Sequence, residues 1–151
     1  MDPLSNSETR KRLTKSSKFI FFDLGVRRFA AREGSNLGPS RIGELFEEFI
    51  GVELIRLLRP LHFTKLHFWR DPNGPEVDWI LKTSDYYLPI EVKYHDHPSE
   101  KDIKHLITFM KEYNCPHGGF VVCNIPRKLK INNQVHAIPW NQLDYLIKLC
   151  E

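Results

Sequence analysis

The sequence predicts an α/β domain in which a central mixed β-sheet is flanked by α-helices. Three observations lead to this prediction. A long amphipathic helix comes early in the chain, three largely apolar strands follow it, and a second helix then precedes a continuously apolar strand. The chain has 151 residues, of which 41% are hydrophobic, so it can form one compact core. The predicted order is helix, three strands, helix, two strands and helix.

The N-terminal region is polar, and we expect a disordered tail over residues 1–16 and a folded domain over residues 17–151. A short strand is predicted at Phe19–Phe22, followed by a turn or short helix. The long helix begins at Pro39 and Ser40, and the Arg59-Pro60 pair ends it. Its apolar residues recur with a period of about 3.6: Ile42, Leu45, Phe46, Phe49, Ile50, Leu54 and Leu57.

Three strands are predicted after this helix, in HFTKLHFWR, PEVDWIL and YYLPIEVKYH. Asn73-Gly74 separates the first two and favours a hairpin turn. Ser99, with Asp102 three residues later, is a capping-box variant that begins a second helix. GGFVVCN is apolar throughout, as in a strand buried on both faces. VHAI is predicted to be one more strand, and PWNQLDYLIKLC a closing helix with Pro139 in its first turn.

Composition narrows the functional classes. The net charge is only +3, so charge alone does not indicate a nucleic-acid partner. Cys115, Cys123 and Cys150 have no CxxC spacing and are expected to be reduced thiols. No apolar run approaches the roughly 20 residues of a membrane span, and the polar start lacks the apolar segment of a secretion signal. We therefore expect a cytoplasmic protein that does not associate with membranes.

Charged residues interrupt the otherwise apolar LPIEVKY. Alternate residues of a strand share a face, so Glu91 and Lys93 point the same way and Val92 points into the core. Asp78 lies on the preceding strand and can share that face if the register allows. Two carboxylates at short range repel each other, and a divalent cation such as Mg²⁺ removes that cost. On a solvated face, the same three residues would need no such explanation.

These residues resemble the motif of the PD-(D/E)XK nuclease superfamily: Asp78, then Glu91-Val92-Lys93, preceded by a helix that carries Glu47. Four blocks, KFIFFDLGVRR, GELFEEFIGVEL, FWRDPNGPEVDWIL and LPIEVKY, also resemble one family in order. It is an uncharacterised prokaryotic domain usually C-terminal to an AAA+-type ATPase domain. The resemblance covers about residues 17 to 147 and implies a restriction-endonuclease-like core. GxxxxGK[ST] does not occur, so we expect a stand-alone relative or the C-terminal part of an ATPase-linked protein.

The resemblance also implies a site and a reaction. Asp78 and Glu91 would hold Mg²⁺ or Mn²⁺ with the backbone carbonyl of Val92, Lys93 would position the attacking water, and Glu47 would assist through metal-bound water. The substrate would be nucleic acid, with DNA favoured, and the reaction hydrolysis of a phosphodiester. Superfamily members can keep the fold without the chemistry. The alternative is a non-catalytic domain that binds nucleic acid or protein and works with an AAA+-type ATPase in the same or another chain.

The long helix offers several carboxylates. Glu44 and Glu48 fall opposite the apolar stripe and are expected to be solvated. Glu47 lies at the edge of the stripe, four residues after Gly43, where a small residue could let the helix approach the sheet. Glu53 lies near the middle of the stripe, where a carboxylate needs a backbone amide or an Arg as partner. The less favoured alternative is that Glu53, and not Glu47, reaches the metal.

Overall fold

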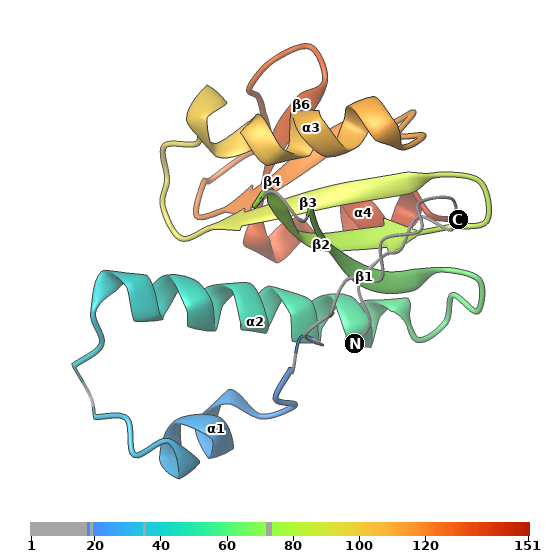
Figure 1. The fold of residues 1–151 in the computed structure, drawn as a ribbon. Coiled ribbons are helices and arrows are strands. Elements are labelled where there is room, and N and C mark those ends of the chain that lie inside the picture. The colour runs from blue at the N-terminus through green and yellow to red at the C-terminus, as the bar shows by residue number, and fades with distance from the viewer. Residues whose placement is uncertain (1–17, 19, 35, 72–73) are drawn as a thin grey trace.

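The computed structural model describes residues 18, 20–34, 36–71 and 74–151, and these form a six-stranded sheet with helices on both faces (Figure 1). The tail expected over residues 1–16 lies outside the described residues. The strands are β1 (Lys65–Arg70), β2 (Glu76–Lys82), β3 (Tyr87–Lys93), β4 (Gly119–Cys123), β5 (Leu129–Lys130) and β6 (Val135–Pro139).

The sheet is mixed, with strand order β1-β2-β3-β4-β6-β5. The strands β1, β2 and β3 form an antiparallel meander. The strands β3, β4 and β6 run parallel, and β5 pairs antiparallel with β6 at the far edge. The predicted α/β class with a central mixed sheet is confirmed. The two-residue strand β5 was not predicted.

The helices are α1 (Leu24–Ala30), α2 (Pro39–Leu58), α3 (Lys104–Glu112) and α4 (Asp144–Lys148), with the 3₁₀ turns η1 (Glu100–Ile103) and η2 (Trp140–Gln142). The predicted bounds of α2 are confirmed, and Ser99 forms the expected capping box with Asp102 ahead of η1. The closing helix is shorter than predicted. Pro139 ends β6 rather than opening a helix, because its partner is Cys123 in the parallel ladder.

The predicted strand at Phe19–Phe22 is wrong for the part that the structure describes, since residues 20–23 form neither strand nor helix. Phe21 and Phe22 are exposed and Phe19 lies outside the described residues. The chain instead turns directly into α1, where the Asp23 carboxylate accepts the N–H groups of Gly25 at 2.8 Å and Val26 at 3.0 Å. This side-chain cap begins the short helix that was one of the two alternatives predicted to follow the segment.

Two apolar clusters hold the sheet between its helices. One joins α2 and α4 to one face, and includes Trp79, Ile90 and Val92. The other joins α3 to the opposite face and includes Ile80 and Val121. Figure 1 shows α3 and α2 on opposite sides of the sheet. Glu91 and Lys93, which alternate with Ile90 and Val92, therefore belong to the α3 side of β3.

Gly51 lets α2 pack closely on the sheet. A Cβ atom at Gly51 would lie 2.5 Å from the Trp79 ring, whereas one at Gly43 would have no neighbour within 4 Å. The expectation that Gly43 provides the close approach is therefore wrong. The Trp79 indole N–H also donates to the backbone carbonyl of Glu47 at 3.3 Å. These two contacts fix the turn of α2 that carries Glu47 over β2.

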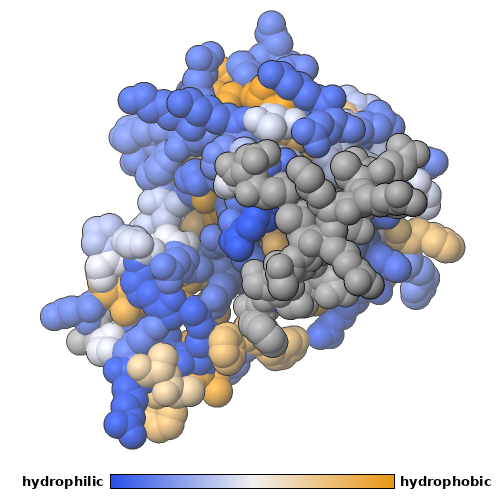
Figure 2. Space-filling view, viewed as in Figure 1, coloured by the Kyte–Doolittle hydropathy of each residue, from blue (hydrophilic) through white to orange (hydrophobic). Residues whose placement is uncertain are grey.

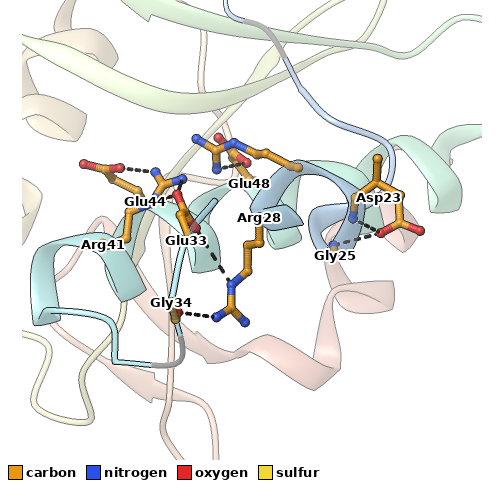
Figure 3. A network of polar contacts seen from close by, with 10 residues as sticks. Asp23, Gly25, Arg28, Glu33, Gly34, Arg41, Glu44 and Glu48 are labelled. Atoms are coloured by element: carbon orange, nitrogen blue, oxygen red, sulfur yellow. Dashed lines mark hydrogen bonds and ion pairs between the residues drawn. The ribbon is translucent and has the colours of Figure 1, made fainter. Parts of the chain in front are cut away.

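None of the residues of α1 is buried, so polar contacts, rather than a buried apolar face, hold α1 and the loop after it against α2. Arg27 bonds to Glu48 at 2.5 Å, and Arg41 bridges Glu33 and Glu44, the latter at 2.5 Å (Figure 3). Apolar side chains remain exposed at this end of the molecule, which lies at the lower left of Figure 2; they include Phe21, Phe22, Val26 and Phe29.

Candidate functional site at the fork between β2 and β3

The alternation of β2 is broken at Asp78. Against β1, His67 pairs with Ile80 but Trp69 pairs with Val77, so β2 holds one residue more than its partner. A bulge of this kind re-aims a side chain and is common beside functional sites. The pairing of β2 with β3 runs from Trp79 opposite Ile90 to the hairpin end. Asp78 therefore lies at a fork, just beyond the last paired residue.

The bulge turns the Asp78 carboxylate across this fork. Its Oδ2 accepts the backbone N–H of Val92 at 2.8 Å. We expected Asp78 to share the face of Glu91 if the register allowed it, and the extra residue in β2 interrupts that register at Asp78. The carboxylate nevertheless lies beside Glu91, because it bonds to the residue that follows Glu91.

Glu91 is buried, with 5% of its surface exposed. Its Oε1 accepts a bond from Lys93 Nζ at 2.8 Å, which agrees with the expectation that the two share a face. Its Oε2 is also buried and has no hydrogen-bond partner among the described residues. A buried carboxylate oxygen without a donor is costly, so this atom is where a missing partner would bind.

Burial and like charges shift the titration of this cluster. Burial raises the pKa of Asp78 well above its usual value, and the charges of Glu91 and Glu47 raise it further. Burial also raises the pKa of Glu91, although Lys93 opposes the shift. Burial lowers the pKa of Lys93, but the Glu91 charge and hydrogen bond outweigh it and the net shift is upward. The cluster therefore disfavours two ionised carboxylates while it favours a cationic lysine.

Glu47 forms an ion pair with Lys18, a residue that the sequence analysis did not select as part of the site. Lys18 Nζ forms an ion pair with Glu47 Oε1 and lies 3.4 Å from the backbone carbonyl oxygen of Asp78. The same ammonium lies 4.2 Å from the centroid of the Trp79 ring. Lys18 is thus a cation provided by the protein itself, placed between α2 and the bulge. Its sequence signals are its position immediately before the apolar run FIFF and its place as the first residue of the KFIFFDLGVRR block.

The other carboxylates of α2 agree with expectation only in part: Glu53 has the Arg partner that was expected of it, but not the burial. Glu53 is not buried in the apolar stripe: 27% of its side chain is exposed, and it bonds to Arg56 one turn along the helix at 2.6 Å. Glu48, expected to be solvated, is largely covered by its pair with Arg27. Glu44 is exposed as predicted. Glu53 is directed to Arg56, whereas the charge of Glu47 acts on Asp78 and Glu91 at the fork.

The residues at the fork fit a small divalent cation with few protein ligands. Within the described parts of the chain, no three Asp, Glu, His or Cys side chains are arranged to hold a metal ion. Mg²⁺, however, commonly takes one or two carboxylates and keeps several waters. Asp78 and the unpartnered oxygen of Glu91 offer such a pair.

The fold and this cluster define an α/β domain with paired carboxylates and a lysine at a strand fork. Residues 42–143 match the sequence profile described as "Domain of unknown function (DUF4143)", and the chain belongs to this family. No curated protein matches the chain. Within the described residues, no helix is both long and apolar enough to cross a membrane, and Cys115, Cys123 and Cys150 are free thiols.

Among solved structures, the chain is similar to part of a Thermococcus gammatolerans assembly, the half-complex of McrB AAA+ hexamers with bound McrC. The sequence identity is 16% and the TM-score is 0.48. The match covers 66% of this chain and 27% of that chain. A likeness at this level carries no argument about function.

Proposed function

We propose that the chain is a metal-dependent nuclease, or a DNA-processing domain derived from one, with its site at the fork between β2 and β3. The observation that carries the proposal is the buried Oε2 of Glu91, which has no partner among the described residues and lies beside the Asp78 carboxylate. The order of helix α2, the meander β1-β2-β3, helix α3 and strand β4 supports it, because this order is expected of a restriction-endonuclease-like core.

In this proposal Asp78 and Glu91 hold Mg²⁺ or Mn²⁺, with the backbone carbonyl of Val92 as a third ligand. The bound cation neutralises the carboxylates and polarises a phosphodiester. Lys93 remains a cation because of Glu91, so it can orient a water molecule and stabilise negative charge that develops on the phosphate. Glu47 orients a second water once its bond to Lys18 is released.

A non-catalytic module remains the second candidate, and a specific observation favours it. Lys18 already places an ammonium between Glu47 and the bulge at Asp78, which is one way to satisfy acidic groups without a metal. In that case the domain would bind nucleic acid or a protein and would act with an AAA+-type ATPase. We propose such an ATPase, in the same or another chain, as a partner in either case.

The deciding experiment incubates the purified chain with single-stranded, duplex and branched DNA and with RNA. Each reaction contains Mg²⁺, Mn²⁺ or EDTA. We expect cleavage with either metal and none with EDTA, and Lys93→Met and Asp78→Asn should each abolish it. Glu53→Gln is the control, because it removes a carboxylate of α2 that bonds to Arg56 and takes no part in the fork. Cleavage that persists in EDTA, or that survives Asp78→Asn, would exclude this site.

A further inference from the structure

Two exposed aromatic rings directly follow the C-terminal ends of β3 and β6, on the α2 side of the sheet. Tyr94 directly follows Lys93, and 53% of its surface is exposed. Trp140 directly follows β6, with 41% exposed. Phe46 packs against Tyr94 with ring centroids 5.3 Å apart, and Phe49 packs against Trp140 at 5.9 Å. Both rings are therefore supported by α2, yet each keeps a large area open to solvent.

The parallel register places these rings at the same level. Lys93 pairs with Cys123, and Cys123 pairs with Pro139, so Tyr94 and Trp140 each lie one residue past an aligned row. With β4 between them, the two strands are about 10 Å apart. This is close to the rise of about three stacked nucleotides. We call Tyr94 and Trp140 the aromatic ledge.

The part of the chain that carries Trp140 has basic residues and no acidic ones. Residues 113–143 contain Arg127, Lys128 and Lys130 and no Asp or Glu. The other 19 Lys and Arg residues are balanced by the 19 Asp and Glu residues of the chain, so this segment carries the whole net charge of +3. Its basic loop leaves β4 at the edge that bears the ledge, where Asn124 N–H donates to the carbonyl of His95 at 3.0 Å.

We propose that the aromatic ledge stacks unpaired bases, so that the ligand of this domain is single-stranded nucleic acid, with Arg127 and Lys130 contacting its phosphates. The inference deepens the proposed function, because Tyr94 follows Lys93 at the same end of β3 and points to the opposite face of the sheet, so that a nucleic-acid strand passing over this end would reach both. Exposed rings offer their faces to bases that are splayed out, whereas the bases of a duplex are already stacked on one another. The basic segment supplies the complementary charge that a neutral apolar protein partner would not require.

The test measures binding in EDTA, so that it does not depend on metal or on cleavage. Fluorescence anisotropy follows a labelled oligo-dT of about 15 nucleotides and a duplex of the same length. We expect the single strand to bind more tightly. Tyr94→Ala and Trp140→Ala should each weaken binding about tenfold, while Tyr94→Phe and Trp140→Phe, which keep a ring, should retain most of it. Phe63→Ala is the matched control, an exposed ring between α2 and β1.

Two further readouts separate stacking from charge. Trp69 and Trp79 are buried and Trp140 is exposed, so oligo-dT should quench intrinsic fluorescence in the wild type and not in Trp140→Phe. The double change Arg127→Gln and Lys130→Gln should lower the slope of log affinity against log salt by about 1.4. Replacing both Lys65 and Lys82 with Gln should leave this slope unchanged, because the two residues pair at the far end of β1 and β2.

The inference is overturned if oligo-dT does not bind, if duplex binds equally well, or if the ledge variants bind like the wild type. A protein ligand that binds at the ledge while oligo-dT does not would also overturn it. Tight single-strand binding without metal-dependent cleavage would uphold the ledge and reject the nuclease. Cleavage that the ledge variants do not affect would uphold the nuclease and reject the ledge.

Discussion

In the metal-free protein, the fold disfavours the ionised forms of the Asp78 and Glu91 carboxyl groups. Both have a raised pKa, chiefly because they are buried. A carboxyl whose pKa is higher in the folded state holds its proton more tightly there than in the unfolded chain. This tighter proton binding adds to the free energy of unfolding. The contribution is complete below the unfolded pKa of about 4 and is lost as the pH rises through the folded pKa. The metal-free protein should therefore lose stability over this range.

Asp78→Asn should raise the melting temperature of the metal-free protein at neutral pH. The amide oxygen can still accept the Val92 N–H, but the like-charge repulsion with Glu91 is gone. The gain should shrink as the pH falls below about 4, where Asp78 becomes protonated in both the folded and the unfolded state. Thermal melts in EDTA at several pH values measure this directly, and a variant that melts below the wild type at neutral pH would contradict the electrostatics described here.

Lys18→Met should tighten Mn²⁺ binding. The Lys18 ammonium lies between Glu47 and the backbone of Asp78, so it repels a divalent ion at the fork. Removing one nearby charge should increase the affinity about tenfold, as measured by isothermal titration calorimetry. Lys82→Met, at the opposite end of β2, is the control. Weaker Mn²⁺ binding after the change at Lys18 would show that this lysine supports the site and does not compete with the metal.

Sequence reasoning succeeded at the residue scale where only local geometry mattered. Glu91 and Lys93 are two residues apart on one strand, so alternation alone predicted their contact. The direction of Asp78 depends on a bulge in the pairing of β2 with β1, which no local pattern reveals. Lys18 lies 29 residues from Glu47 and 60 from Asp78 in the sequence. Such a contact is fixed only by the tertiary fold.

Helix α2 shows where reasoning from one element fails. The Pro residues at its ends predicted its bounds and the 3.6 period predicted its buried stripe, yet the buried positions are Ile50, Gly51, Leu54 and Leu58. A stripe drawn only through large apolar residues misses Gly51. The Trp79 ring occupies the space that a side chain at Gly51 would fill. Including Gly51 rotates the buried face away from Glu53, which therefore lies at its edge and pairs with Arg56. The Trp79 ring that packs on Gly51, rather than helical periodicity alone, determines which face of α2 is buried.

Two glycines of α2 give a matched pair. Gly51→Ala should destabilise the protein by about 1–3 kcal/mol, because its Cβ atom would overlap the Trp79 ring. Gly43→Ala meets nothing within 4 Å and should stabilise the helix by about 0.5–1 kcal/mol. Urea unfolding at constant pH gives both free energies. If Gly51→Ala proved neutral, α2 could not pack as closely on β2 as the structure shows.

At the scale of the whole molecule, the mixed sheet brings the candidate site and the aromatic ledge to one end of its central strands. The meander places Asp78 beside Glu91, and the parallel strands β3 and β6 end at the level of Tyr94 and Trp140. The order of elements predicted from the sequence was sufficient for the class and the meander. It did not give the bulge, the strand β5 or the alignment of the ledge, because each depends on pairing between distant segments.

The most direct test of the central claim is the melting temperature as a function of Mn²⁺ concentration. A metal that binds only the folded state stabilises it by mass action, about 2.7 kcal/mol at 100 times Kd, which is about 5–10 °C for a chain of this size. We predict this rise for the wild type and for Glu53→Gln, and its loss in Asp78→Asn and Glu91→Gln. A wild-type melting temperature that is unchanged by millimolar Mn²⁺ would contradict a metal site at the fork.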